Sequence, residues 1–463
     1  MNKTANRIVT AQLFHKVFYR FMSTPAHPRF RVNGLTREKQ QLMRAPVEEI
    51  SKNQAARMRD LLVHAWRHCD FYHERFASVG LTNESDLVID NIAVIPTLSK
   101  KEIQENFEGL LSKVGNRKNW RENSSGGSTG QTVVLMQDPQ YREESRASTF
   151  VSDAMQGWKF GNRTALLWGA ARDTDPMMSL GGRVVRLLQN MRVYNSFDMG
   201  PEKMLQYHRD MEAYQPDNII AYAGSAYLFA KFLLDAQLKP GYPRASIITS
   251  AETLTDDMRA TIEECFGMPV YNRYGSREVG MIGTECSCHS GLHLHLDKYT
   301  ETLDLECDEP VWGEPGFVTI TLFSNWAMPL IRYKIGDVGI LGRELCECGV
   351  NTPKFSKILG RSSDFIVSPS GNMIHGEYFT HVFYGQRNIR QFQFVQETPT
   401  SFKVRIVKDG ELDPNQLDHI RKEIEEVLGE GSKIQFEFPA HIPPAPSGKF
   451  RFTISNVVTQ HGG

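Results

Sequence analysis

The chain has 463 residues, too many for one ordinary hydrophobic core, so we expect about two to four domains. Its 53 lysine and arginine residues balance 54 aspartate and glutamate residues, which argues against a general nucleic-acid or lipid-surface binder. No apolar run approaches the roughly 20 residues that span a bilayer, and the N-terminus lacks the apolar stretch of a signal peptide, so we expect a cytoplasmic protein.

Helical periodicity dominates the first hundred residues. One face of an N-terminal helix is expected to pack on the body of the protein, with attachment to a membrane surface as the alternative. That face would carry Ile8, Leu13, Val17, Phe18 and Phe21. A second amphipathic helix is predicted between Glu49 and Phe76, and Ser99 with Glu102 forms a capping box that begins another helix.

A glycine-rich loop follows and precedes a short apolar run. It reads SSGGSTG and consists of Ser124, Ser125, Gly126, Gly127, Ser128, Thr129 and Gly130. Such a loop, placed at a strand turn, can direct backbone N–H groups and hydroxyls towards the phosphates of a nucleotide. It is not a Walker A loop, because Gly130 is followed by Gln131 and Thr132 instead of lysine and a hydroxyl residue. The alternative is a solvated hairpin.

Between residues 164 and 269, short apolar strands alternate with helical stretches. Strands are predicted at 165–168, 218–222 and 246–249, and helices at 203–214, 227–236 and 256–266. This alternation indicates a parallel α/β sheet, in which ligands bind at the carboxyl ends of the strands. Two polar segments, SAE at 250–252 and YGSRE at 274–278, follow strands in this region.

The pattern becomes strand-rich from Gly316, and a separate small α+β domain is predicted from about residue 365 to the end. Within that domain a helix is expected around 417–428 between alternating strands. Prolines at positions 443, 444 and 446 exclude regular structure there, so Lys449 is expected on a loop.

Six motifs stand in a fixed order, and together they resemble the adenylate-forming superfamily of acyl-CoA synthetases, ligases and peptide-synthetase adenylation domains. They are SSGGSTG at 124–130, SAE at 250–252, YGSRE at 274–278, RYKIGD at 332–337, GRSSD at 360–364 and PSGKFR at 446–451. The early helix 62–72 and the segment Pro96–Lys100 are similar to the phenylacetate–CoA ligase-like family. The stretch 364–376 resembles the members associated with capsular and exopolysaccharide gene clusters.

This resemblance implies an α/β fold with two domains. Residues 1–361 would form a large AMP-binding domain of parallel and mixed sheets with helices and a β-rich subdomain. Residues 362–463 would form a small mobile α+β domain that carries the catalytic lysine. The family's reaction implies ATP, Mg²⁺ and coenzyme A as partners, and we expect a monomer or a dimer.

Residue roles follow from the resemblance. The glycine loop would hold the β- and γ-phosphates, and Ser250, Ala251 and Glu252 would line the adenine. Tyr274 would stack on the adenine, with Gly275 and Ser276 beside it. Glu278 is the candidate Mg²⁺ ligand, since that ion takes one or two carboxylates with phosphate oxygens.

Three further residues complete the expected active site. Asp337 would accept hydrogen bonds from the ribose hydroxyls, a task suited to a carboxylate. Arg361 would contact ribose or phosphate at the domain junction, and Asp364 would act as the hinge. Lys449 would bridge the substrate carboxylate and the α-phosphate. Taken alone, this residue is better explained as a solvated lysine of the tail, and the upstream motifs reverse that preference.

Five of the seven cysteines fall between residues 286 and 348, and the odd total argues for reduced thiols. Thiolates and imidazoles in two short knuckles suit a structural Zn²⁺. Relatives that bind zinc suggest Cys286, His293, Cys346 and Cys348 as ligands, with Cys288 and His295 as spare candidates. Free buried thiols are the alternative.

We therefore expect ATP-dependent formation of an acyl-adenylate with release of pyrophosphate, followed by acyl transfer to coenzyme A. Transfer to an amine, such as an amino sugar in polysaccharide synthesis, is the close alternative. A non-catalytic, zinc-stabilised nucleotide-binding scaffold is a hypothesis of another class. The acid would bind near Tyr141, Trp168 and the segment 222–224.

Overall fold

The computed structural model describes residues 29–124, 133–169, 186–187, 189–196, 199–361, 365–370, 373–383, 386, 388–443 and 452–457. Several predicted features lie outside these residues: the N-terminal apolar face, positions 125–130 of the glycine loop, Asp364, Lys449 and the side chain of Arg361. The remaining predicted site residues are all described.

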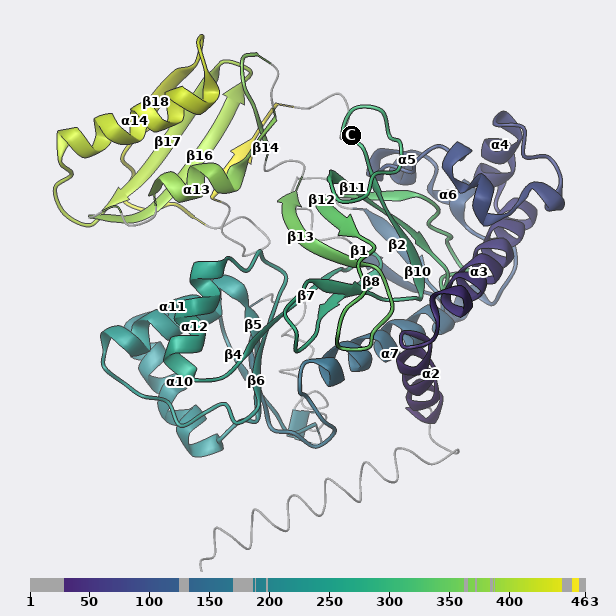
Figure 1. The fold of residues 1–463 in the computed structure, drawn as a ribbon, viewed down its shortest axis with the longest axis horizontal. Helices are drawn as coiled ribbons and strands as arrows, with labels where there is room; N and C mark the ends of the chain where they lie inside the picture. The colour runs from purple at the N-terminus through teal and green to yellow at the C-terminus, as the bar shows by residue number, and fades with distance from the viewer. Residues whose placement is uncertain are drawn as a thin grey trace, which may run out of the picture.

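An eleven-stranded mixed sheet organises the large N-terminal part of the chain (Figure 1). Its strand order is β10-β11-β12-β13-β9-β8-β7-β6-β5-β3-β4. In chain order the strands are β3 (Thr164–Leu167), β4 (Met191–Tyr194), β5 (Asn218–Tyr222), β6 (Ser246–Ser250), β7 (Val270–Ser276), β8 (Gly280–Glu285), β9 (Leu292–Leu294), β10 (Lys298–Leu303), β11 (Pro315–Leu322), β12 (Tyr333–Gly342) and β13 (Lys354–Arg361).

Strands β3 to β7 are parallel, and the strands from β8 onward join antiparallel. The parallel half carries α10 (Pro201–Tyr214), α11 (Ala223–Asp235) and α12 (Asp256–Phe266), whose apolar faces pack with the strands in one core. The alternating pattern of the sequence therefore predicted this half correctly. Within the sheet, β7 pairs parallel with β6 and antiparallel with β8, so the pairing changes at this strand.

Helices from the start of the chain cover the antiparallel half (Figure 1). They are α2 (Arg29–Leu42), α3 (Val47–His68), α4 (Asp70–Ser78), α5 (Lys100–Glu105), α6 (Phe107–Leu110) and α7 (Pro139–Met155), with 3₁₀ turns at Glu84–Asp86, Ile89–Val94 and Arg117–Asn119. The predicted helix from 49 to 76 is two helices, because extended backbone at Cys69 separates α3 from α4. The capping box of Ser99 and Glu102 is confirmed at the start of α5.

A small α+β domain ends the chain. A four-stranded sheet of order β18-β17-β16-β19 packs against α13 (Gly376–Phe383) and α14 (Pro414–Leu428) around one apolar core. Its strands are β16 (Ile389–Thr398), β17 (Ser401–Lys408), β18 (Lys433–Glu437) and β19 (Thr453–Ser455), and a hairpin of β14 (Phe365–Val367) and β15 (Met373–His375) precedes them. This confirms the predicted fold class of a large α/β part and a small α+β domain.

No helix among the described residues combines the length and apolar character needed to cross a bilayer.

Candidate active site and metal centre

The carboxyl ends of β6 and β7 form the centre of the candidate active site. Ser250 ends β6 and pairs with Arg273 of β7, one residue before Tyr274. Because both strands are parallel, the SAE and YGSRE segments leave the sheet at the same edge. The structure thus brings together two motifs that are more than twenty residues apart in the sequence.

Tyr274 and Asp337 are in direct contact across this site. The tyrosine hydroxyl donates a hydrogen bond of 2.7 Å to Oδ2 of Asp337, which lies on β12. Asp337 is also the register partner of Arg361 on β13. Three residues predicted to surround the nucleotide therefore lie within one neighbourhood, although nothing in the sequence indicated the hydrogen bond.

A tight turn between β7 and β8 presents Glu278. Ser276 pairs with Gly280, and the Ser276 hydroxyl accepts a hydrogen bond from the Val279 N–H at 3.3 Å. A Cβ on Gly275 would lie 2.7 Å from the Gly280 carbonyl oxygen, so only glycine fits beneath this turn. Glu278 is 9% exposed, so the turn holds a carboxylate that is largely withdrawn from solvent.

The glycine loop begins beside this turn. Strands β1 (Arg121–Ser124) and β2 (Val134–Gln137) pair antiparallel, with Ser124 opposite Val134, which confirms the predicted strand turn around the loop. The Asn123 side chain donates to the Arg277 carbonyl oxygen at 2.8 Å. The start of the phosphate-loop candidate is therefore fixed next to the candidate Mg²⁺ ligand.

The SAE segment makes a sharp turn after β6. Ala251 has a φ of +69°, a conformation that is strained for a residue with a Cβ. Oε2 of Glu252 accepts a hydrogen bond of 2.8 Å from the Gly224 N–H, in the first turn of α11. One carboxylate oxygen of Glu252 thus fastens the predicted adenine loop to the helix beside the predicted acid pocket.

Aromatic side chains make two contacts in the region expected to bind the acid, one between rings and one hydrogen bond. The rings of Trp168 and Tyr222 lie with their centroids 4.0 Å apart at the ends of β3 and β5. Tyr141 donates to the Glu278 carbonyl oxygen at 3.3 Å, and burial raises the pKa of its phenol, so it stays neutral. Tyr141 therefore borders the Glu278 turn, while the Trp168–Tyr222 pair lies on the parallel half of the sheet.

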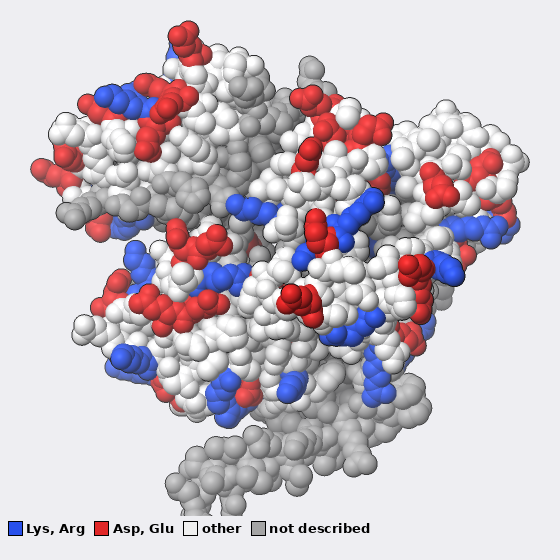
Figure 2. All heavy atoms as spheres, viewed as in Figure 1, with Lys and Arg blue, Asp and Glu red and all other residues white. Residues whose placement is uncertain are grey.

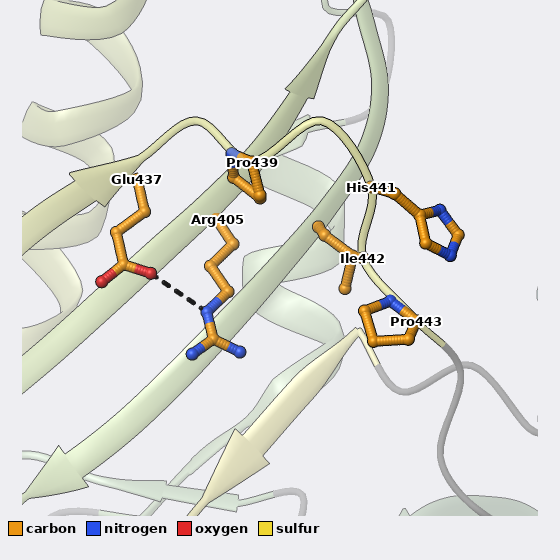
Figure 3. Close-up of a pocket in the computed structure, with 6 residues that line it drawn as sticks. All are labelled: Arg405, Glu437, Pro439, His441, Ile442 and Pro443. Atoms are coloured by element: carbon orange, nitrogen blue, oxygen red, sulfur yellow. Dashed lines mark hydrogen bonds and ion pairs between the residues drawn. The ribbon is translucent and has the colours of Figure 1, made fainter.

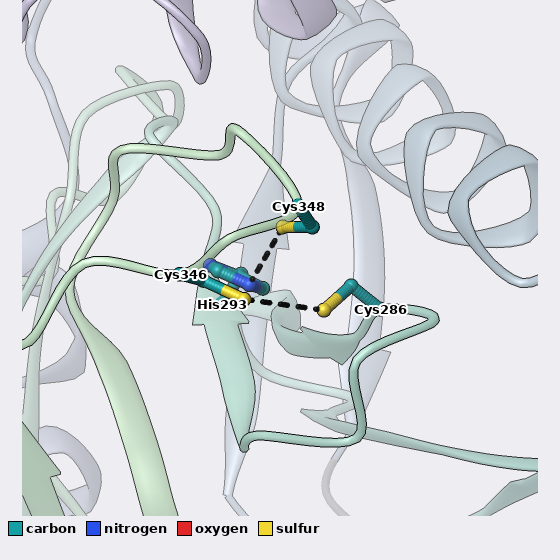
Figure 4. A group of neighbouring side chains, drawn as sticks. All are labelled: Cys286, His293, Cys346 and Cys348. Carbon is teal, nitrogen blue, oxygen red and sulfur yellow. Dashed lines mark hydrogen bonds between the residues drawn. The ribbon is translucent and has the colours of Figure 1, made fainter.

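The four predicted zinc ligands form one group, which we call the Cys/His cluster: Cys286, His293, Cys346 and Cys348 (Figure 4). Their candidate ligand atoms all lie within 4.8 Å of one another. The Sγ atoms of Cys286 and Cys346 are 3.7 Å apart, and Sγ of Cys348 is 3.4 Å from Nε2 of His293. A tetrahedral zinc ion with its usual bond lengths has ligand–ligand distances of about 3.6 to 3.8 Å, so the donor set and its spacing fit this ion.

The two spare candidates lie outside the Cys/His cluster. Cys288 is exposed, and His295 is fully buried with its Nε2 at 2.8 Å from the Thr284 hydroxyl. Burial lowers the pKa of His293, which favours the neutral imidazole that a metal requires. Although burial acts against it, the hydrogen bond from Ser290 helps to lower the pKa of Cys346. These environments favour ligand-competent forms of both side chains.

A cavity of about 410 Å³ lies in the C-terminal domain, on the segment that leads towards Lys449 (Figure 3). It is lined by Arg405, Glu437, Pro439, His441, Ile442 and Pro443. Of the predicted site residues that the structure describes, none lines this cavity. On the face drawn in Figure 2, acidic and basic side chains are interspersed among the described residues.

Some neighbours of the site were assigned no role from the sequence. Arg332 opens the RYKIGD motif, yet its guanidinium is buried against the carbonyl oxygens of Ala93 and Ile95 and faces Glu301. It therefore holds the segment before α5 against β12. Ser290 and Lys354 border the Cys/His cluster and were likewise unmarked, because a lone serine or lysine carries no pattern of its own.

Comparison with known proteins gives one family and several relatives. The sequence profile of the family described as "CapK C-terminal domain" matches residues 366–456. The chain is 26% identical to "Protein CapK" of Staphylococcus aureus over 407 residues, covering 84% of this chain and 86% of that protein. It is 23% identical to a phenylacetate-coenzyme A ligase of Pseudomonas putida over 396 residues, with the same coverage of both chains.

Solved structures share the fold. A 2-hydroxyisobutyryl-CoA ligase in the postadenylation state, in complex with 2-HIB-AMP, superposes with a TM-score of 0.68 at 18% identity, over 89% of this chain and 90% of that chain. The amide bond synthetase McbA from Marinactinospora thermotolerans superposes with a TM-score of 0.51 at 14% identity, over 73% and 68%. At these identities the likeness concerns the fold alone.

The sequence relatives and the fold agree with the order of the six motifs along the chain. The C-terminal profile and the S. aureus relative indicate the branch, and the phenylacetate-coenzyme A ligases indicate the wider group. In sequence the chain is therefore similar to CapK and to the phenylacetate–CoA ligases of the adenylate-forming superfamily, and its C-terminal domain matches the CapK C-terminal domain family.

Proposed function

We propose that this protein is an adenylate-forming ligase that activates a carboxylic acid with ATP and transfers the acyl group to coenzyme A. The hydrogen bond between Tyr274 and Asp337 carries the proposal, since it joins two motifs expected to surround one nucleoside. Glu278 follows Tyr274 in the turn after β7, and Asn123, just before the glycine loop, binds that turn at Arg277; together they would add the groups that a triphosphate and Mg²⁺ need.

The proposed reaction has two steps. A carboxylate oxygen of the acid attacks the α-phosphorus of ATP, the bond to the β-phosphate oxygen breaks, and pyrophosphate leaves. The thiol of coenzyme A then loses its proton and attacks the acyl carbonyl carbon, and AMP leaves with the bonding electron pair. Because both steps concentrate negative charge, the site must supply preorganised donors and cations.

Each residue of the candidate site would have a separate role in this reaction. Asp337 would accept hydrogen bonds from the ribose hydroxyls while Tyr274 holds its carboxylate in place. Glu278, at the tip of its glycine-dependent turn, would hold Mg²⁺ together with phosphate oxygens. Arg361 and Lys449 would supply positive charge from the domain junction and the C-terminal domain.

The Cys/His cluster would hold one structural zinc ion. Its three thiols and one imidazole match a closed tetrahedral site without a position for substrate. Bound zinc would supply cross-linking of two chain segments and no reaction step. These segments are the region after β8 and the turn between β12 and β13.

The test is pyrophosphate release from ATP and Mg²⁺ with a panel of aryl, fatty, hydroxy and short-chain acids, with and without coenzyme A. We expect acid-dependent release from the wild type. Lys449→Ala should lose roughly a hundred- to a thousandfold in rate, the usual cost of one preorganised donor. Lys408→Ala, which removes an exposed lysine of the same domain, is the matched control and should keep full activity.

Parallel reactions with coenzyme A or an amino sugar identify the acceptor of the acyl group. Acyl thioester formed with coenzyme A supports the proposal, whereas amide formed only when an amino sugar is supplied assigns the chain to amine ligation. Nucleotide binding without pyrophosphate release under any of these conditions would favour the hypothesis of a non-catalytic scaffold.

A further inference from the structure

A buried lysine is linked to the Cys/His cluster through the hydroxyl group of one serine. Lys354 begins β13, is only 9% exposed, and is the register partner of His293 on β9. Its ammonium donates a hydrogen bond of 3.2 Å to the Ser290 hydroxyl, and that hydroxyl lies 3.0 Å from Sγ of Cys346. Ammonium, hydroxyl and sulfur thus form a continuous chain.

The charge of this lysine needs an explanation. A buried ammonium is costly unless an opposite charge compensates it. The other buried lysines of the described chain obey this rule, since Lys39 faces Glu144 at 2.5 Å and Lys298 faces Asp297 at 2.7 Å. Across the described ranges, no carboxylate lies within ion-pair distance of Lys354, and a neutral hydroxyl does not supply the missing charge.

We propose that Lys354 is the counter-ion of a metal centre in the Cys/His cluster and acts on it through Ser290. Three thiolates and a neutral imidazole around a divalent ion leave one net negative charge on the centre. The buried ammonium compensates that negative charge. The Ser290 hydroxyl connects the ammonium to Sγ of Cys346 by two hydrogen bonds. Lys354 is therefore a positioning residue, and its role does not depend on the ligase activity.

Local geometry keeps this chain of contacts in place. A Cβ on Gly291 would lie 2.4 Å from the Phe355 carbonyl oxygen, so the absence of a side chain there lets β13 approach the knuckle closely. This approach sets Ser290 between Lys354 and Cys346. The partners of metal ligands typically contribute tenfold to a hundredfold in metal affinity.

Zinc transfer to a chromophoric chelator tests the proposal in the full-length, zinc-loaded protein. We expect Lys354→Met to release zinc roughly 10- to 100-fold faster than the wild type and Lys354→Arg, which keeps the charge, to stay close to it. Ser290→Ala should change release in the same direction as Lys354→Met. Lys118→Met, which removes an exposed lysine, is the charge-matched control and should have no effect.

A spectroscopic measurement separates this role from simple packing. With cobalt(II) in place of zinc, Lys354→Met should shift the thiolate-to-cobalt charge-transfer band, because the hydrogen bonding of the Cys346 sulfur changes, and Lys118→Met should not. Three results would each overturn the proposal: a wild-type protein that retains no zinc, release from Lys354→Met at the wild-type rate, or release from Lys354→Arg as fast as from Lys354→Met. If Lys354→Met does not fold, the zinc-release rates of Ser290→Ala and Lys354→Arg still test the proposal: release from Ser290→Ala should be faster than from the wild type, and release from Lys354→Arg should not.

Discussion

At the scale of single residues, one side chain of the candidate site holds another in place by a hydrogen bond. Tyr274 was expected to contribute its ring to the adenine, and its hydroxyl also binds the carboxylate of Asp337. Under the proposed function, this hydrogen bond would hold the carboxylate in the orientation that accepts the ribose hydroxyls. The same hydrogen bond makes the role of the hydroxyl measurable apart from that of the ring.

Tyr274→Phe keeps the ring and removes this hydrogen bond. We expect the KM for ATP to rise about 2- to 10-fold, the equivalent of one hydrogen bond, with a smaller change in kcat. Isothermal titration with ATP alone checks the same change without turnover. Tyr227→Phe, on helix α11, is the control and should bind ATP normally. Unchanged binding in Tyr274→Phe would show that the hydroxyl does not position Asp337.

At the scale of elements, short polar contacts decide where helices begin. The Ser99–Glu102 capping box starts α5, and Glu102 also binds Arg75 of α4 at 2.8 Å. Burial raises the pKa of Glu102, but its hydrogen bonds with Arg75 and Ser99 outweigh burial and lower the pKa below its ordinary value. The ionised carboxylate therefore stabilises the folded state.

Glu102→Gln tests this contribution through its pH dependence. Because the folded-state pKa is depressed, the stabilisation is fully present above the unfolded-state pKa and is lost as the pH falls through the folded-state value. We expect the variant to be about 0.5 to 1.5 kcal/mol less stable at pH 7, with the difference shrinking below about pH 4. Chemical denaturation between pH 3 and pH 7 measures it, and a constant difference across that range would contradict the assignment.

The contact between β13 and the knuckle before β9 depends on a glycine. Gly291 has a φ of +124° and no room for a Cβ. Gly291→Ala should destabilise the protein by about 1 to 3 kcal/mol and weaken zinc retention, because the strands must separate. Gly34→Ala, where nothing lies within 4 Å in helix α2, should be neutral or stabilising by up to about 1 kcal/mol. Equal stability of the two variants in denaturant titrations would refute this account.

At the scale of the whole molecule, the Cys/His cluster connects segments that are distant in the chain. The knuckle of Cys348 also contacts the junction of α2 and α3: Arg44 donates to the Cys348 carbonyl oxygen at 2.9 Å, and the Asn351 N–H donates to the Met43 carbonyl oxygen at 2.8 Å. Loss of a metal ion here would release the first helices, the central strands and the β12–β13 turn together.

Under the proposal of a structural zinc ion, removal of this ion should lower the thermal stability of the N-terminal part of the chain. We expect chelation to reduce its Tm by roughly 5 °C or more, and added zinc to restore it. Differential scanning calorimetry with and without chelator measures this shift, and Cys286→Ala should reproduce it. Cys307→Ala, an exposed cysteine outside the cluster, is the matched control. A Tm that does not respond to chelator would refute a structural metal.

The sequence by itself determined the features that local patterns encode. Helical and strand periodicity depends on neighbouring residues, so α10 to α12, β5, β6 and the capping box of α5 were predicted close to their observed bounds. The order of the motifs likewise pointed to the relatives that the comparisons found. The two knuckles drew attention to a metal site, but only the resemblance to zinc-binding relatives selected the four members of the Cys/His cluster from the six candidates.

Only the tertiary structure decided which side chains meet. The bonds from Tyr274 to Asp337 and from Glu252 to Gly224, and the link from Lys354 to Cys346, join residues that are 63, 28 and 8 positions apart. Such contacts arise from sheet register and backbone approach, which depend on how many distant elements pack at once. The break between α3 and α4 at Cys69 was not predicted either, because the apolar periodicity of the sequence continues across it.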